Sequence, residues 1–165
     1  MNEEYEKLLE RAHSRHEAMK KNLALVSKNR KAKNFDKEVH AIHEKIFSEI
    51  DCTKCGNCCR NLGPKFNETD IVRISSELGM RRVAFATVYL REDEDGDMVL
   101  AELPCRFLGE DNLCSIYDSR PRACRNYPHT EEKNLQPKMR LLAQNILYCP
   151  AAVLIADEII ARFAK

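Results

Sequence analysis

Hydrophobic and polar positions follow a helical periodicity along the first part of the chain. Over residues 2–29, apolar side chains recur at spacings of four and three, while Glu and Lys occupy the other faces. This pattern predicts a long amphipathic helix. Its apolar stripe consists of Tyr5, Leu9, Ala12, His16, Met19, Leu23 and Val26.

A second amphipathic helix is predicted after Asn34. The two helices are joined by a basic segment at 28–33, which is expected to hold a turn. Residues 1–50 are therefore predicted to form a helical hairpin. The hairpin could pack on the rest of the chain, form the seam of an oligomer, or bind a protein partner. Packing is favoured, because the heptad-like stripe is short for a coiled coil. The apolar face of the second helix consists of Phe35, Val39, Ile42, Ile46 and Ile50.

The pattern changes at Asp51. Residues 51–150 hold all eight Cys, all five Gly and all six Pro of the chain, and they contain few long periodic apolar segments. Asn67 or Thr69 is expected to cap the first short helix of this region. The helices predicted here cover residues 67–78, 81–90 and 139–148.

Charged and proline-rich segments separate these helices. The sequence EDEDGD at 92–97 predicts a charged turn, and a strand returning from it at 98–103 would complete a short β-hairpin. Two X-Pro pairs predict irregular backbone around Cys124. Pro150 is expected to interrupt the helical pattern before a last helix at 151–163.

The expected fold class is mainly α. A small metal-stapled cysteine-cluster domain, with irregular loops and a short β-hairpin, follows the helical hairpin. The expected domain limits are 1–50 for the hairpin, 51–150 for the cysteine-cluster domain, and 151–165 for a C-terminal helix that packs on that domain.

Charge and hydropathy exclude several classes of protein. The formal net charge is +1, from 27 basic and 26 acidic side chains, so a globally basic nucleic-acid binder is disfavoured. The basic stretch at 20–37 has no aromatic interleaving beyond Phe35, which favours a solvated helix end over a nucleic-acid surface. The longest apolar run, at 151–156, is far shorter than a membrane span. The acidic N-terminus lacks the apolar region of a secretory signal, so a cytoplasmic location is expected.

Cysteine spacing carries the strongest chemical signal. In a reducing compartment, clustered thiols indicate metal or redox chemistry more often than disulfides. The run Cys52-Thr-Lys-Cys55-Gly-Asn-Cys58-Cys59 contains overlapping C-x2-C turns. Such a turn places two sulfurs on one metal, and three Cys at this spacing are also typical of cubane iron–sulfur clusters. Because Cys58 and Cys59 are adjacent, one of them could serve a second site or bridge two metals.

The other four cysteines are too far apart for one metal knuckle and must converge through the fold. Eight thiolates could divide into two four-sulfur sites, although spacing does not determine the division. Cys149 lies outside the dense region, so a small buried apolar role is its main alternative. The candidate metal ligands are Cys52, Cys55, Cys58, Cys59, Cys105, Cys114, Cys124 and Cys149.

Arginine follows three of these cysteines directly. Guanidinium groups of Arg60, Arg106 and Arg125 could offset the negative charge of a four-thiolate centre and donate hydrogen bonds to it. They are therefore candidate supporting residues for the bound group. His129 is a reserve ligand, since eight thiolates already suffice.

These motifs resemble the CxxCxxCC zinc- or iron-chelating domain family, also called YkgJ-like cysteine cluster proteins. The resemblance covers residues 51–150 and implies metal chelation without a settled reaction. A flagellin lysine methylase associated with an iron–sulfur cluster also resembles this family, but this chain has no separate motif for S-adenosylmethionine. The matching residues are Cys52, Cys55, Cys58, Cys59, Cys105, Cys114, Ile116, Tyr117, Arg120, Pro121, Cys124, Arg125, Pro128 and Cys149.

The sequence therefore predicts an intracellular metal-binding protein. An iron–sulfur cluster with a redox or protein-modification role is slightly favoured. The alternatives are a zinc-stapled interaction module and a metal-delivery or metal-sensing protein. No Ser-His-Asp arrangement, phosphate loop or dinucleotide fingerprint is present, so no motif assigns an enzymatic reaction.

Overall fold

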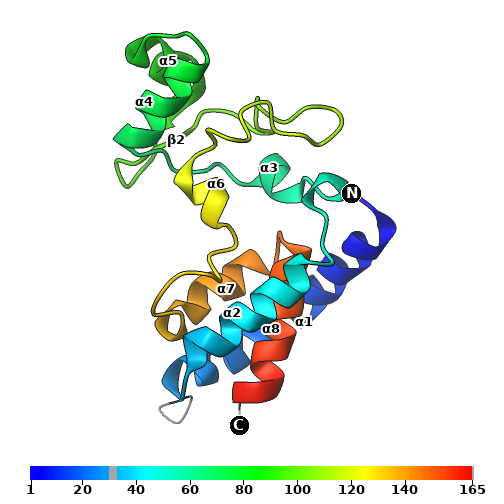
Figure 1. Cartoon of the computed structure of the whole chain (residues 1–165). Helices are drawn as coiled ribbons and strands as arrows, with labels where there is room; N and C mark the ends of the chain where they lie inside the picture. The colour runs from blue at the N-terminus through cyan, green and yellow to red at the C-terminus, as the bar shows by residue number, and fades with distance from the viewer. Residues whose placement is uncertain (30–32, 165) are drawn as a thin grey trace. The chain divides into compact units, whose positions relative to one another are not determined.

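The computed structural model describes residues 1–29 and 33–164 and confirms a mainly α fold. The described residues form eight α-helices, two short 3-10 helices and one two-stranded antiparallel sheet (Figure 1). They divide into two compact units. Unit 1 combines residues 1–51 with 128–165, and unit 2 consists of residues 52–127. The limits predicted from sequence, at residues 50 and 150, stay a prediction about independent folding.

Unit 1 is a cluster of helices from both ends of the chain. Helix α1 packs on α7 and α8, and α2 packs on α8. Asn2 caps α1, because its side-chain oxygen accepts a hydrogen bond from the backbone N–H of Tyr5. The elements of this unit are α1 (Glu3–Lys28), α2 (Phe35–Phe47), the 3-10 helix η2 (Gln136–Lys138), α7 (Met139–Asn145) and α8 (Pro150–Phe163).

The predicted apolar stripe of α1 lies in the core of unit 1. All of its members are buried except His16, which is half-buried and places its Nε2 2.9 Å from the carbonyl oxygen of Ala143. Leu23 and Val26 are completely enclosed. Burying such side chains stabilises a fold by about 1.5–3 kcal/mol each. The stripe therefore packs against other helices of its own chain.

Prolines and turns bound the helices of unit 1. Pro150 was expected to interrupt the helical pattern, but it is the first residue of α8. Proline is tolerated there because the backbone N–H that it lacks would have no hydrogen-bond partner in the first turn of a helix. Asn34 has a left-handed backbone with φ 55° just before α2. Residues 30–32 lie outside the described residues. They belong to the turn predicted at 28–33 and to the basic stretch at 20–37.

Unit 2 surrounds a small apolar core. The predicted hairpin is present, and β1 pairs with β2 in an antiparallel register that places Leu90 opposite Leu100. Buried Phe66, Ile74 and Phe85 pack with these strands. The elements are η1 (Cys52–Lys54), α3 (Asn57–Asn61), α4 (Glu68–Glu77), α5 (Arg82–Tyr89), β1 (Leu90–Glu92), β2 (Met98–Leu100) and α6 (Arg122–Asn126).

Helix α6 differs from the sequence-based expectation. Cys124 lies in helix α6, although irregular backbone was expected around it. Pro121 precedes the first helical residue with φ −53°, and its carbonyl oxygen accepts a hydrogen bond from the N–H of Arg125. Proline therefore starts this helix instead of breaking it. In the described part of the chain, no helix has the length and apolar character needed to cross a membrane.

Candidate metal centre

Seven of the eight candidate thiols belong to unit 2. Cys52 begins η1 and is exposed, Cys55 is buried, and the others are partly buried. All eight cysteines lie in the described residues, and the structure records them as thiols and not as disulfides. Cys149 belongs to unit 1, where it precedes α8 and packs partly against the helical core.

Cys59 lies close to a second thiol and to the segment that carries Cys105. Its Sγ lies 3.9 Å from the Sγ of Cys58, and its backbone oxygen accepts a hydrogen bond from the N–H of Cys105 at 2.9 Å. The hydrogen bond from the Cys58 thiol lowers the pKa of Cys59 to about 7, and the positive charge of Arg60 acts in the same direction. This lowered pKa favours the thiolate form of Cys59 near neutral pH.

Three other thiols respond to the charge on Cys59. Burial, together with negative charge on Cys59, Cys105 and Cys114, raises the pKa of Cys124 to about 12. Burial also raises the pKa values of Cys105 and Cys114, with a smaller contribution from Cys59. Together these four thiols form the sulfur cluster of unit 2. Without a cation, its members oppose one another's ionisation.

A polar clamp fixes the first C-x2-C turn. The guanidinium of Arg60 donates hydrogen bonds to the backbone oxygen of Cys55, at 3.1 Å, and to the side-chain oxygen of Asn112. The amide nitrogen of Asn112 donates to the backbone oxygen of Thr53 at 2.8 Å. Residues 53–55 are thereby tied to the loop between Cys105 and Cys114.

Gly56 is required where this clamp closes. Its φ of 60° lies in the left-handed region, and a Cβ there would lie 2.4 Å from Arg60 Nη1 and 2.9 Å from Asn112 Oδ1. Any side chain at this position would thus meet both backbone strain and a collision with the clamp.

The Gly56→Ala variant is expected to lose more stability than Gly79→Ala. Gly79 has a similar φ of 64°, but nothing lies within 4 Å of a Cβ built on it. Backbone strain alone lowers the free energy of unfolding by about 1–2 kcal/mol, which is the loss expected for Gly79→Ala. In Gly56→Ala the broken clamp adds to this strain, so the expected loss is about 2–3 kcal/mol. Urea unfolding of both variants checks this expectation. Equal losses would show that the clamp contributes nothing.

A buried carboxylate positions the segment that leads to Cys124. Asp70 is 1% exposed. Its Oδ1 accepts hydrogen bonds from Arg73 Nη2 at 2.6 Å and from the backbone N–H of Arg122 at 3.1 Å. Arg73 in turn donates to the backbone oxygens of Ser119 and Arg120. Helix α4 thereby holds the start of α6.

Sequence reasoning missed both Asp70 and Asn112. Asp70 did carry a signal, because Asn67-x-x-Asp70 is a capping box and both of its hydrogen bonds are present. That signal indicates the start of α4 but not the contact with α6. Asn112 carried no comparable signal, since its partners lie far away in sequence.

The three arginines predicted to support a bound group have different surroundings. Arg60 belongs to the clamp, and its charge favours ionisation of Cys55 and Cys59. Arg106 is exposed and donates two hydrogen bonds to the Glu102 carboxylate, at 3.0 and 2.7 Å. Arg125 is exposed on α6. Of these three arginines, Arg60 is the one that donates a hydrogen bond to the cysteine run, at the backbone oxygen of Cys55.

The reserve ligand His129 belongs to unit 1 and has a left-handed backbone with φ 68°. Its Nδ1 lies 2.9 Å from a carboxylate oxygen of Glu132, which also binds Lys138. The hydrogen bonds from Lys138 and His129 lower the pKa of Glu132 to about 2. This histidine therefore takes part in an ion-pair network of the helical unit.

The described residues contain no group of three or more His, Cys, Asp or Glu side chains already arranged to hold a metal ion. The donor chemistry nevertheless fits zinc and iron, both of which bind sets of four thiolates. The sulfur cluster of unit 2 supplies four such donors from three segments of the chain, so metal binding would require these segments to draw closer together.

A family model described as "Putative zinc- or iron-chelating domain" and named CxxCxxCC matches residues 51–144. The match covers more than half of the chain and ends before Cys149. Comparison with curated proteins and with solved structures found no match.

Proposed function

Because the chain belongs to the CxxCxxCC family of zinc- or iron-chelating domains, we propose that it is a metal-binding protein whose ion or cluster is held by thiols of unit 2. The observation that carries this proposal is the position of Cys59. Its Sγ lies 3.9 Å from the Sγ of Cys58, and its backbone oxygen accepts a hydrogen bond from the N–H of Cys105, which belongs to a segment far away in sequence. Leu108 forms an antiparallel bridge with Cys114, so the fold also brings the 105–114 loop back towards this point.

The sulfur cluster of unit 2 is the proposed first set of ligands. The lowered pKa of Cys59 suits it to bind a cation near neutral pH. The cation would then offset the negative charge that opposes ionisation of Cys124. Both steps release protons, and both favour closing the 105–114 loop and α6 around the bound group.

The remaining thiols of the cysteine run, Cys52, Cys55 and Cys58, are proposed as ligands of the same or a second metal group. Arg60 supports this assignment, since it holds the backbone at Cys55. Cys149 stays a predicted ligand on sequence grounds alone. Arg106 and Arg125 likewise stay predicted supporting residues.

An iron–sulfur cluster is proposed in preference to zinc, because three cysteines at C-x2-C-x2-C spacing can reach three irons of one cube. Such a cluster would supply one-electron redox chemistry, suited to electron transfer or to a protein-modification reaction. The alternative is zinc, which would make the protein a structural interaction module or a metal-delivery protein. Eight thiols also suit a reducing compartment, so we propose a cytoplasmic location.

Purification without oxygen tests the proposal. We expect a visible absorption band, together with iron and acid-labile sulfide in stoichiometric amounts. Cys59→Ser should abolish the band, whereas Arg91→Ala, an exposed substitution on β1, should retain it. Colourless protein with stoichiometric zinc would overturn the iron–sulfur assignment and favour the structural role. Protein that binds neither metal would overturn metal binding itself.

A further inference from the structure

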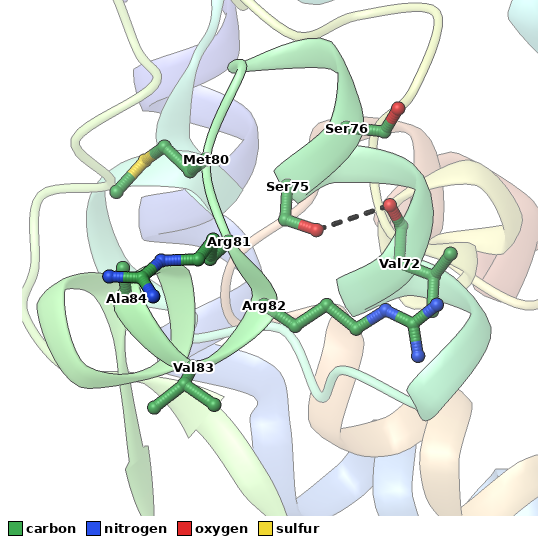
Figure 2. A pocket seen from close by; sticks show the side chains of 8 residues that line it. All are labelled: Val72, Ser75, Ser76, Met80, Arg81, Arg82, Val83 and Ala84. Atoms are coloured by element: carbon green, nitrogen blue, oxygen red, sulfur yellow. Dashed lines mark hydrogen bonds between the residues drawn. The ribbon is translucent and has the colours of Figure 1, made fainter.

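A surface hollow of about 840 Å³ lies between α4 and α5, at the apolar core of unit 2 and among residues that carry no candidate metal ligand. Figure 2 shows its lining, to which both helices and the turn joining them contribute. The lining residues are Val72, Ser75, Ser76, Met80, Arg81, Arg82, Val83 and Ala84.

Apolar side chains form much of this lining. Val72, Met80 and Ala84 contribute partly buried surface, and Val83 is 79% exposed in the first turn of α5. The buried Ser75 hydroxyl donates to the backbone oxygen of Val72 at 3.2 Å (Figure 2), so it satisfies its hydrogen bond within α4. The hollow therefore offers a largely apolar surface to a ligand.

Two arginines give the hollow a positive charge. Figure 2 shows the side chains of Arg81 and Arg82 extending in opposite directions from adjacent backbone positions. Both are exposed, and neither makes a salt bridge or side-chain hydrogen bond with a described residue. Arg60, Arg73 and Arg106 of the same unit have partners, whereas Arg91, Arg122 and Arg125 resemble Arg81 and Arg82 in having no side-chain partner among the described residues.

The start of α5 adds to this charge. Its first turn contains no acidic residue, and Arg81 caps it without a side-chain hydrogen bond. A helix N-terminus is positive and usually carries acidic side chains. Two guanidinium groups at this end increase the positive potential, which a carboxylate from another molecule would offset.

We infer that the hollow between α4 and α5 docks a segment of a partner protein that presents an apolar side chain flanked by carboxylates. Arg81 and Arg82 would each bind one carboxylate, and guanidinium groups bind carboxylates with paired hydrogen bonds. Met80 and Val83 would bury the apolar side chain. A nucleic-acid backbone would match the positive charge but would leave the apolar lining uncovered. The acidic 92–97 turn of a second copy would also match the charge and leave the apolar lining uncovered. The inference does not depend on the proposed metal chemistry.

The experiment measures fluorescence anisotropy of a labelled peptide of alternating Glu and Leu, titrated with the full-length, metal-loaded protein. We expect saturable binding that weakens as salt is added. The R81A/R82A variant should bind at least about tenfold more weakly, and V83S about threefold more weakly. Arg91→Ala, which removes an exposed arginine outside the hollow, should bind as the wild type does.

Charge reversal provides a test that does not rest on loss of binding. The R81E/R82E variant should reject the Glu–Leu peptide and gain affinity for a Lys–Leu peptide, which a misfolded protein would not do. Wild-type affinity in R81A/R82A, or absence of saturable binding to the wild type, would overturn the inference. So would equal affinity for a Glu–Ser peptide, or tighter binding of a DNA oligonucleotide of matched charge. Sedimentation that shows self-association through Arg81 and Arg82 would replace the partner with a second copy.

Discussion

Removing the metal from the purified protein is expected to raise hydrogen exchange at residues 52–62 and 105–126 by at least about 100-fold. These segments carry the thiols of unit 2 and contribute only Phe107 and Ile116 to its buried apolar core. Helices α3 and α6 are only five residues long, and neither contains a fully buried residue. Helices this short are unstable without tertiary contacts, so a bound metal should provide much of their stability.

Other parts of the chain should keep their protection. Helices α4 and α5 share the apolar core of unit 2, in which Ile74 and Phe85 are completely enclosed. Helices α1 and α8 are supported by the core of unit 1. Loss of metal should therefore be seen as a local change in exchange, confined mainly to the cysteine-bearing segments.

Hydrogen exchange read by mass spectrometry, before and after anaerobic chelation, checks this expectation. Cys124→Ser should give the same pattern as chelation, and Arg91→Ala, an exposed substitution on β1, is the control. Unchanged exchange at 52–62 and 105–126 after verified metal removal would contradict a stabilising role for the metal. Uniform loss of protection along the chain would contradict the expected confinement to these segments.

Leu23→Asp is expected to unfold unit 1 under conditions in which the wild type is folded. Leu23 has no exposed surface and lies in the core with α7 and α8. The substitution removes an apolar side chain and buries a carboxylate without a partner, which together cost about 4 kcal/mol or more. A cost of this size is a large fraction of the stability of an ordinary domain.

Leu25→Asp on the same helix is the matched control, since Leu25 is 56% exposed. It should change the urea midpoint little. Circular dichroism and sedimentation at several concentrations distinguish core packing from an oligomer seam. If the stripe were a seam, Leu23→Asp would release folded monomers and would leave the urea midpoint of those monomers intact. The same analysis applies to Leu9 and Met19.

The long helices were predictable because their signal is local. The apolar residues from Tyr5 to Val26 recur with the period of an α-helix and so fall on one face of it. That face is buried in the structure. Helices α3 and α6 were missed for the opposite reason. Each has only five residues, which is too few for a period to emerge, and each is preceded by a Gly or Pro that usually indicates a turn.

The candidate site was predictable in its chemistry but not in its arrangement. Thiol spacing identified a metal-binding run, because sulfur ligands close together in sequence must be close in space. Spacing could not show that the backbone of Cys59 is hydrogen-bonded to that of Cys105. Nor could it show that Asn112 and Asp70 fix the loops, because these contacts join segments about fifty residues apart.

The order of the two units along the chain has a consequence for biosynthesis. Unit 2 is inserted into unit 1, whose core needs α7 and α8 from the end of the chain. Because α1 and α2 are synthesised before α7 and α8, their apolar faces lack these partners until the later helices have left the ribosome. Metal binding by the middle segment during synthesis would reduce the number of conformations that separate the two halves of the helical core. The metal supply would then affect how long these apolar faces stay exposed, in addition to any chemistry that the metal supports.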